Sequence, residues 1–321
     1  MELKRAGLHL SGTALWMDAR RKSELCFVSH AHADHIGRHE RVIATAATLR
    51  LMEHRLGRAK SALPVPYHRP FELGSLVLEL LPAGHVLGSA QLRVVLPDGT
   101  RVVYTGDLGL SPSLTAEPAA IAECDVLVTE STFGHPKYAF PPRERTFDRL
   151  ADWCRNAIAR GFQPVVLAYA LGKSQEAAAA LTKRGLPVSA HPKIHDVCAI
   201  YGELGTPLEV RRFDGTFLPG EVALFPPQMA RASVLTRIRR TTAVLTGWAL
   251  DGPVAQRRHG ADTAFPISDH ADFPQLVRYA KATGASEVLT VHGFSDELAE
   301  ALRAEGLVSR AIHRPLQLPL L

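Results

Sequence analysis

The chain has few cysteines and no long hydrophobic run. Its 321 residues include only four cysteines, at positions 26, 124, 154 and 198, with no close pair among them. This spacing argues against both a disulfide framework and a thiolate zinc site, and it favours a reducing cytoplasm. The most apolar run, residues 165–171, is far too short to span a bilayer, so we expect no secretion and no membrane insertion.

An excess of one charge is also nearly absent. The formal net charge is only +5, which by itself gives a weak preference for polyanionic partners. Arginines do cluster at residues 231–240 and 257–258, where they could follow a phosphate backbone or form an ordinary solvated helix face. No repeat of solenoid length and no low-complexity tract is visible. With 46% hydrophobic residues, the chain can form one large globular domain or two moderate ones.

One short segment concentrates groups that bind metals. Residues 30–35 read His-Ala-His-Ala-Asp-His and follow the apolar, β-prone residues 25–29. A strand that ends here would deliver its ligands where the backbone turns outward. Three histidines and one aspartate at this spacing can hold two divalent metals. The simpler interpretation is a histidine-rich surface loop.

Other ligand types follow expected strand ends elsewhere in the chain. His85, Asp107 and His292 each adjoin a glycine, and Glu130 ends another apolar run. Glycines beside ligands let the backbone approach a crowded site. Strand ends that meet at one edge of a sheet are the usual position of pockets in α/β enzymes. Together with the first segment they indicate a shared metal centre, although either histidine alone would more simply be a core or surface residue.

Helical and strand periodicities divide the chain. The expected strands are residues 75–81, 91–96, 101–105, 164–169, 186–190 and 287–291, and the expected helices are residues 144–160, 174–182 and 272–283. A Pro-Asp-Gly turn at residues 97–99 predicts a hairpin. The β-α alternation predicts a small α/β unit over residues 139–245, inserted into a larger domain formed by residues 1–138 and 246–321.

Seven motifs occur in one order along nearly the whole chain. They are Leu15-Trp16-Met17-Asp18, residues 30–35, Gly84-His85-Val86-Leu87-Gly88-Ser89, Thr105-Gly106-Asp107-Leu108-Gly109, Glu130-Ser131-Thr132-Phe133-Gly134, Ser268-Asp269-His270-Ala271-Asp272 and Val291-His292-Gly293. This set resembles the metallo-β-lactamase superfamily. The fifth motif, together with residues 170–176, resembles its β-CASP nuclease branch and is lacking in simple esterase, lactonase and glyoxalase relatives. The resemblance implies an αββα sandwich with an inserted small α/β domain.

The resemblance also implies two metal sites. One metal would be held by His30, His32 and His85, the other by Asp34, His35 and His292, with Asp107 bridging them. Nitrogen and oxygen ligands without a thiolate suit zinc, with manganese or iron as alternatives. Two cations about 3.5–4 Å apart lower the pKa of a bridging water, which then supplies hydroxide for in-line attack on phosphorus.

Further roles are implied by the same resemblance. His270 is similar to a histidine that faces the leaving oxygen, and Glu130 to the carboxylate that orients it. With Asp34 and Asp107 they are the expected catalytic residues. Asp18 would fix the ligand loop by hydrogen bonds without binding metal itself.

Three residues are expected to contact the substrate. Lys173 and Ser174 follow a glycine at a helix start, where backbone N–H groups and an ammonium could hold a phosphate. The alternative is an ordinary helix start with an exposed lysine. Trp248 could stack on a base, or it could be a plain core residue.

The sequence leaves the nucleic acid open. A histidine at the position of His292 is described as typical of RNA-processing β-CASP members, and valine of DNA-crosslink-repair members. The compact length and short inserted unit look more like bacterial ligase-associated DNA exonucleases, so DNA is favoured over RNA. The expected function is a DNA exonuclease in DNA repair, associated functionally with a DNA ligase and a helicase. Two other classes stay open: a small-molecule metallo-hydrolase, and a non-catalytic nucleic-acid-binding subunit, which the filled ligand positions disfavour.

Overall fold

The computed structural model describes residues 2–4 and 7–313, which fall into two compact units. The first unit contains the described residues up to Leu110, then Ala116–Pro136, and the described residues from His270 onward. The second contains Ser111–Thr115 and Lys137–Asp269. Residues 314–321, which the sequence pattern assigned to the larger domain, lie outside the described part of the chain.

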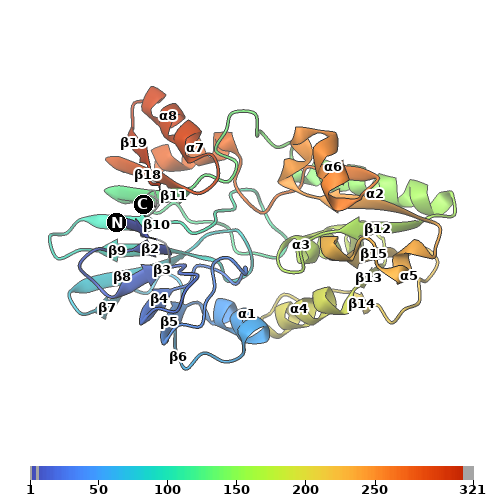
Figure 1. Cartoon of the computed structure of the whole chain (residues 1–321), viewed down its shortest axis with the longest axis horizontal. Coiled ribbons are helices and arrows are strands. Elements are labelled where there is room, and N and C mark those ends of the chain that lie inside the picture. Colours follow the sequence, from blue (N-terminus) through green and yellow to red (C-terminus); the bar gives the residue numbers. More distant parts are fainter. Residues whose placement is uncertain (1, 5–6, 314–321) are drawn as a thin grey trace, which may run out of the picture. The chain divides into compact units, whose positions relative to one another are not determined.

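Two sheets make up most of the first unit (Figure 1). In spatial order the first sheet contains β1 (Glu2–Lys4), β2 (Gly7–His9), β3 (Leu15–Met17), β4 (Leu25–Phe27), β5 (Arg41–Ala44) and β6 (Ser61–Pro64). β1 to β3 pair antiparallel, whereas β3 to β6 pair parallel. Helix α1 (Ala46–Leu56) connects the last two strands, and Thr45 caps its start by accepting a hydrogen bond from the Thr48 N–H.

The second sheet has a parallel half and an antiparallel half. Its order is β19 (Val308–Ala311), β18 (Glu287–Val291), β11 (Val126–Glu130), β10 (Arg101–Tyr104), β9 (Ala90–Val95), β8 (Leu76–Pro82) and β7 (Phe71–Leu73). The strands from β19 to β10 are parallel, and those from β10 to β7 are antiparallel. β9 and β10 form the hairpin expected at the Pro-Asp-Gly turn, where Asp98 accepts a hydrogen bond from the Thr100 N–H at 2.9 Å.

The core of the first unit lies between the two sheets. Alternate residues of β8 and β9, such as Leu78, Leu80 and Leu92, are fully buried and pack against Phe27 and Ile43 of the first sheet. Residues of the same sheet such as Leu81 and Val103 belong to a separate apolar cluster, so this sheet is buried on both faces. Helices α7 (Phe273–Ala282) and α8 (Ser295–Ala304) lie beside β18 and β19 (Figure 1) and bury a separate apolar cluster against the second sheet. The expectation of an α/β sandwich is confirmed.

The second unit is a single parallel sheet with helices. Its strands, in spatial order, are β14 (Arg211–Arg212), β13 (Val188–Ala190), β15 (Val222–Phe225), β12 (Gln163–Leu167), β16 (Arg240–Leu245) and β17 (Thr263–Phe265). The helices are α2 (Arg143–Ala159), α3 (Lys173–Thr182), α4 (Pro192–Glu203), α5 (Ser233–Thr236) and α6 (Pro253–His259), with short 3₁₀ turns η1 (Pro227–Met229) and η2 (Gly247–Asp251). Two apolar clusters enclose the central strands, which explains their continuous hydrophobic runs.

The boundary of the second unit lies beyond residue 245. Residues 246–269, which the sequence pattern placed in the larger domain, belong to the second unit because β17 pairs in parallel with β16 and extends its sheet. All the helices and strands expected from periodicity are present within a few residues of their expected ends. None of the described helices is both long and apolar enough to cross a bilayer. The four cysteines are buried free thiols.

Candidate metal centre

Loops that follow strands of the first unit carry the expected metal ligands. His30 and His32 lie shortly after β4, His85 after β8 and Asp107 after β10. Gly106 precedes Asp107 with φ of 56°, and a Cβ atom at this position would lie 2.5 Å from the Cβ of Ser29. Only glycine therefore allows the Asp107 loop to approach the histidine loop so closely.

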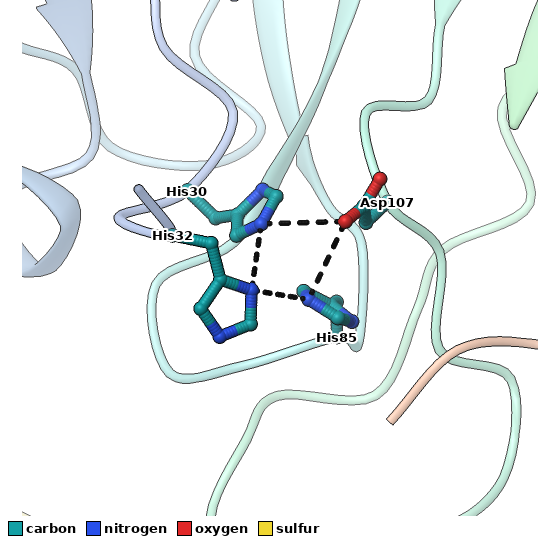
Figure 2. A group of neighbouring side chains, drawn as sticks. All are labelled: His30, His32, His85 and Asp107. Atoms are coloured by element: carbon teal, nitrogen blue, oxygen red, sulfur yellow. Dashed lines mark hydrogen bonds and ion pairs between the residues drawn. The ribbon is translucent and has the colours of Figure 1, made fainter. Parts of the chain in front are cut away.

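Four of these side chains form one tight group, which Figure 2 shows pointing toward one another. The Nε2 atoms of His30 and His85 each lie 3.0 Å from the Nδ1 atom of His32. The Oδ2 atom of Asp107 is 3.5 Å from His30 Nε2 and 3.7 Å from His85 Nε2. Three imidazole nitrogens and a carboxylate oxygen that converge in this way match the donor set that a divalent cation takes in proteins.

Asp18 organises the histidine loop from behind. Its Oδ1 atom accepts a hydrogen bond from the Ser29 N–H at 2.7 Å, and its Oδ2 atom accepts from the Ser29 hydroxyl at 2.6 Å. Oδ2 also accepts from His35 Nδ1 and from the Tyr104 hydroxyl, each at 2.8 Å. Asp18 thus lies outside the tight group, and with His30 and His35 it forms a second group that could itself hold an ion. Its supporting role, which the resemblance implied, stays a prediction.

These contacts also select the tautomers of two ligands. Because Asp18 is an acceptor, His35 must donate from Nδ1, which leaves its Nε2 atom 3.3 Å from Asp107 Oδ2. The Ser29 hydroxyl donates to Asp18, so its oxygen accepts from His30 Nδ1 at 2.9 Å. Both imidazoles are therefore held at Nδ1 and present Nε2 to Asp107. This is the arrangement in which protein histidines usually bind metals, so the residues present fit a cation.

The pKa values in the group follow from burial and from charge. Burial lowers the pKa of His30 well below its usual value, which favours the neutral form that a metal ligand needs. Burial also opposes a charge on His35, but Asp107 and Asp18 outweigh it and raise the pKa of His35 well above the usual value. Although burial alone would raise it, the pKa of Asp107 is held well below its usual range, chiefly by His35 and His270.

The second set of expected ligands is looser. Asp34 Oδ2 lies 3.8 Å from His35 Nε2 and 3.9 Å from the Arg20 guanidinium, and the Asp34 side chain is 60% exposed. His292 has a positive φ of 65°, and its ring centroid is 6.5 Å from that of His35. The structure brings His35 to Asp107 but leaves Asp34 and His292 at the edge of the group. A second metal held by these three residues stays a prediction.

His270 and Glu130 form a pair beside the tight group. His270 Nδ1 lies 3.0 and 3.1 Å from the two Glu130 carboxylate oxygens, so it donates its proton to them. Glu130 is buried and also accepts a 2.6 Å hydrogen bond from the Leu108 N–H, which fixes its orientation. His270 Nε2 is then directed toward Asp107 Oδ2, 3.9 Å away. The pair can deliver or receive a proton at the margin of the metal centre.

Sequence reasoning missed two residues of this site. Ser29 and Tyr104 both contact Asp18 with their hydroxyl groups, and both are buried. Ser29 stands immediately before the histidine motif, and Tyr104 ends β10 three residues before Asp107. Both hydroxyl residues stand close to a ligand motif in the sequence, which could have indicated a role in the site. The sequence does not show, however, that either hydroxyl contacts Asp18.

The expected substrate-binding residues lie in the second unit. The ammonium of Lys173 is 2.5 Å from Asp269 Oδ1, and both side chains are buried. The Ser174 hydroxyl donates to the Tyr169 carbonyl oxygen at 2.7 Å, and Trp248 packs edge-on against Tyr138. The two polar groups are therefore engaged in internal contacts. Their expected contacts with phosphate, and base stacking by Trp248, stay predictions that the side-chain geometry does not support.

Comparison with known proteins agrees with the geometry of the first unit. Residues 14–160 match the Beta-lactamase superfamily domain. A protein named Probable DNA ligase from Opitutus terrae is 38% identical over 317 residues, which are 98% of this chain and 31% of that protein.

A ribonuclease and a DNA cross-link repair protein are also among the relatives. RNase aCSPSF2 of Saccharolobus solfataricus is 30% identical over 191 residues, which are 50% of this chain and 38% of that protein. DNA cross-link repair protein SNM1 of Arabidopsis thaliana is 28% identical over 181 residues, 51% of this chain and 37% of that protein. The chain therefore spans between 31% and 38% of the length of these three relatives.

Proposed function

We propose that this protein is a metal-dependent phosphodiesterase that acts on nucleic acid. Its match to a metallo-β-lactamase domain and its similarity to β-CASP nucleases support this proposal. Within that class we favour a DNA exonuclease that serves DNA repair. One observation carries the proposal: three imidazole nitrogens and the Asp107 carboxylate converge beside the His270–Glu130 pair.

The ligands suit divalent cations, and zinc before manganese or iron. His30, His32, His85 and Asp107 would hold the first cation, and Asp34, His35 and His292 would complete a second site with Asp107 between the two. When bound, such cations acidify water and offset negative charge on the phosphoryl oxygens.

The chain's own residues handle the proton of the leaving group. Glu130 accepts the Nδ1 proton of His270, and this contact orients the ring so that Nε2 faces the ligand group. Hydrolysis breaks one P–O bond, and the departing sugar oxygen takes up a proton. His270 Nε2 is placed to donate it, which gives His270 the role of general acid and Glu130 the role of positioning residue.

A substrate preference for DNA rests on similarity. Nearly the whole chain matches part of a protein named Probable DNA ligase, and a second relative is named as a DNA cross-link repair protein. An activity that trims DNA ends before a ligase seals them would be consistent with both names. Functional association with a DNA ligase follows from this proposal, whereas association with a helicase and a cytoplasmic location stay predictions from the sequence.

A ribonuclease is the second candidate. RNase aCSPSF2 is similar over half of the chain, and His292 is the residue expected of RNA-processing relatives. The same metal centre and the same proton donor would serve an RNA phosphodiester.

Time-resolved digestion of matched single-stranded DNA and RNA oligonucleotides, labelled at either end, tests the proposal. We expect stepwise shortening of DNA from one end, and we expect a chelator to stop it. If RNA is digested faster than DNA, the protein is a ribonuclease. If neither polymer is cut while a thioester or lactone is hydrolysed, the protein is a small-molecule hydrolase.

Variants of His270 test the proton donor. His270→Ala should slow cleavage by about 10²- to 10⁴-fold, because general acid catalysis contributes that much. The matched control is His68→Ala, since His68 is an exposed histidine of the first unit outside the metal centre. Unchanged cleavage by His270→Ala would show that another group protonates the leaving oxygen.

A further inference from the structure

A cavity of about 140 Å³ lies in the first unit outside the group of metal ligands. One wall is the face of α1 that carries Leu49, Met52 and Leu56, which are buried or half-buried. The turn that follows α1, residues 37–39 and Lys22 complete the lining. An apolar cavity of about 150 Å³ can bind benzene, so this cavity has room for a group of about that size. Its mainly apolar wall suits a flat apolar group.

Cations surround this apolar wall. Lys22, Arg38, Arg58 and Lys60 all line the cavity and are exposed, whereas Glu53 is the one carboxylate among its lining residues. Among the described residues, only one of these four cations forms an ion pair: Lys22 lies 2.9 Å from a Glu40 carboxylate oxygen. Arg38, Arg58 and Lys60 therefore keep charges that no neighbouring carboxylate within 4 Å neutralises.

All residues that line the cavity come from one basic segment of the chain, residues 20–60. Residues 20–60 contain nine Lys and Arg residues against four Asp and Glu residues, an excess of five. The formal net charge of the whole chain is also +5, so the rest of the chain is balanced. The lining itself contains four cations and one carboxylate, and an excess of positive charge of this kind is the electrostatic footprint of a polyanion site.

The cavity shares a loop with the metal ligands. His35 is followed by Ile36, and the next three residues, 37–39, line the cavity. On the other side of the motif, Arg20 donates a 2.9 Å hydrogen bond to the carbonyl oxygen of Asp34. Only one residue of the protein separates the ligand His35 from the segment that lines the cavity. A polymer that is bound at the metal ligands can therefore extend to the basic rim.

We propose that this cavity binds one nucleotide of a single-stranded nucleic acid, with the base against Leu49, Met52 and Leu56 and the flanking phosphates at Arg38, Arg58 and Lys60. The ligand class rests on the proposed function, whereas the site rests on the apolar wall and the unneutralised cations. A small inorganic anion would leave the apolar wall unused. The carbonyl end of α1 carries partial negative charge, so the phosphates bind at the side chains and not at the helix end.

Binding measurements with two charge-matched triple variants test the site. Arg38→Ala, Arg58→Ala and Lys60→Ala remove the rim cations together. The control removes Arg69, Arg278 and Arg310, three exposed arginines of the same unit that do not line the cavity. The probe is a fluorescent single-stranded DNA of 12 nucleotides, and the protein is treated with chelator so that no cleavage occurs.

The rim variant should bind about tenfold to a hundredfold more weakly, and its log–log salt dependence should fall by about 2, since each phosphate contact with a single strand contributes about 0.7. The control should lose less than about threefold, because only the overall charge has changed. Equal losses in the two variants would overturn the site and leave only a general effect of net charge.

A cavity-filling variant separates the apolar wall from the charges. Ala59 lines the cavity and is half-buried, so Ala59→Trp fills it without removing a cation. We expect a several-fold loss of DNA affinity with an unchanged salt dependence, and an unchanged unfolding midpoint confirms that the variant folds. Unchanged affinity in a folded Ala59→Trp protein would show that no base enters the cavity.

Nucleotide binding in the cavity and nuclease activity can be rejected separately. Metal-dependent cleavage by the unmodified protein, together with equal binding by both triple variants, would uphold the function and reject the cavity. Cavity-dependent DNA binding without any cleavage would uphold the site and reject the nuclease. If inorganic phosphate competes with DNA only for the rim cations, the cavity is a site for a free anion. This result would overturn the proposal that it binds a nucleotide.

Discussion

Buried charged groups behave differently in the two units. In the second unit the Lys173 ammonium pairs with Asp269, and Glu176 accepts hydrogen bonds from the Ser113 and Thr115 hydroxyls. Each of these charged groups contacts a group of opposite charge or accepts hydrogen bonds from hydroxyl donors. In the first unit, three imidazole nitrogens converge on one another and on Asp107 instead.

The difference separates structural burial from a binding site. A buried charge with its own partners stabilises one packing arrangement and offers nothing further to a ligand. Imidazole nitrogens whose lone pairs face one another cannot bond to each other directly, because a proton or a cation must lie between two lone pairs. The histidine motif therefore indicates a metal centre, whereas the buried lysine of the second unit indicates a structural ion pair.

The largest effect is expected from a substitution of Asp107. Asp107→Asn keeps the size of the side chain but removes the charge on which four histidines converge. We expect loss of bound metal and a fall in cleavage rate of about a thousandfold or more, the equivalent of several kcal/mol. Metal analysis and single-turnover cleavage measure the two effects. Asp98→Asn, in the exposed turn between β9 and β10, is the control, and full metal content in Asp107→Asn would contradict the assignment.

The ion pair of the second unit should affect stability. Lys173→Met leaves the Asp269 carboxylate without its lysine, which should lower the free energy of unfolding by about 3–5 kcal/mol. Lys173→Met combined with Asp269→Leu should recover most of that loss, because no unpaired charge is then buried. Denaturant unfolding compares the three proteins. A stable Lys173→Met protein that binds DNA poorly would instead support the phosphate contact expected from the sequence.

A smaller effect should follow removal of one hydroxyl behind the metal ligands. Tyr104→Phe deletes the hydrogen bond to Asp18, which holds His35 in place. Metal affinity should fall by about tenfold to a hundredfold, and stability by about 1 kcal/mol. The matched control is Tyr279→Phe, since this buried hydroxyl of the same unit bonds Gln91 away from the ligands. If both variants lose the same stability and neither loses metal affinity, Tyr104 is purely structural.

The smallest effect concerns a partly exposed pair in the first unit. Arg101 lowers the pKa of the Asp125 carboxyl from 3.8 to about 2 by hydrogen bonding. A depressed pKa means that the ionised form stabilises the fold above pH 3.8, and that this contribution disappears as the pH falls through about 2.

We therefore expect Asp125→Asn to unfold at slightly lower denaturant concentration than the unmodified protein at pH 7, with the difference shrinking between pH 3.8 and pH 2. Denaturant midpoints across that range measure it. Glu123→Gln is the control, because Glu123 lies 3.8 Å from Arg101 and is more exposed. A difference that does not depend on pH would exclude the ion pair as its source.

Much of the fold could be predicted because its elements depend on local pattern. The alternation in β8 and β9, the Pro-Asp-Gly turn between β9 and β10, and the helical spacing in α2 depend on residues within a few positions of one another. The end of the second unit could not be predicted in the same way. It depends on the pairing of β17 with β16, and a strand pair is decided by tertiary contacts.

The ligand types of the first unit and their approximate positions could be predicted from the sequence, since residues 30–35 place four ligands in one short loop. Which of their atoms meet depends on how distant segments pack. Tyr104 and Asp18 are separated by 86 positions in the chain, yet their contact helps to orient His35. Packing likewise pairs Lys173, an expected phosphate ligand, with Asp269. The physical reason is that spacing along the chain sets local geometry, whereas hydrogen-bond partners and desolvation are set by packing between distant segments.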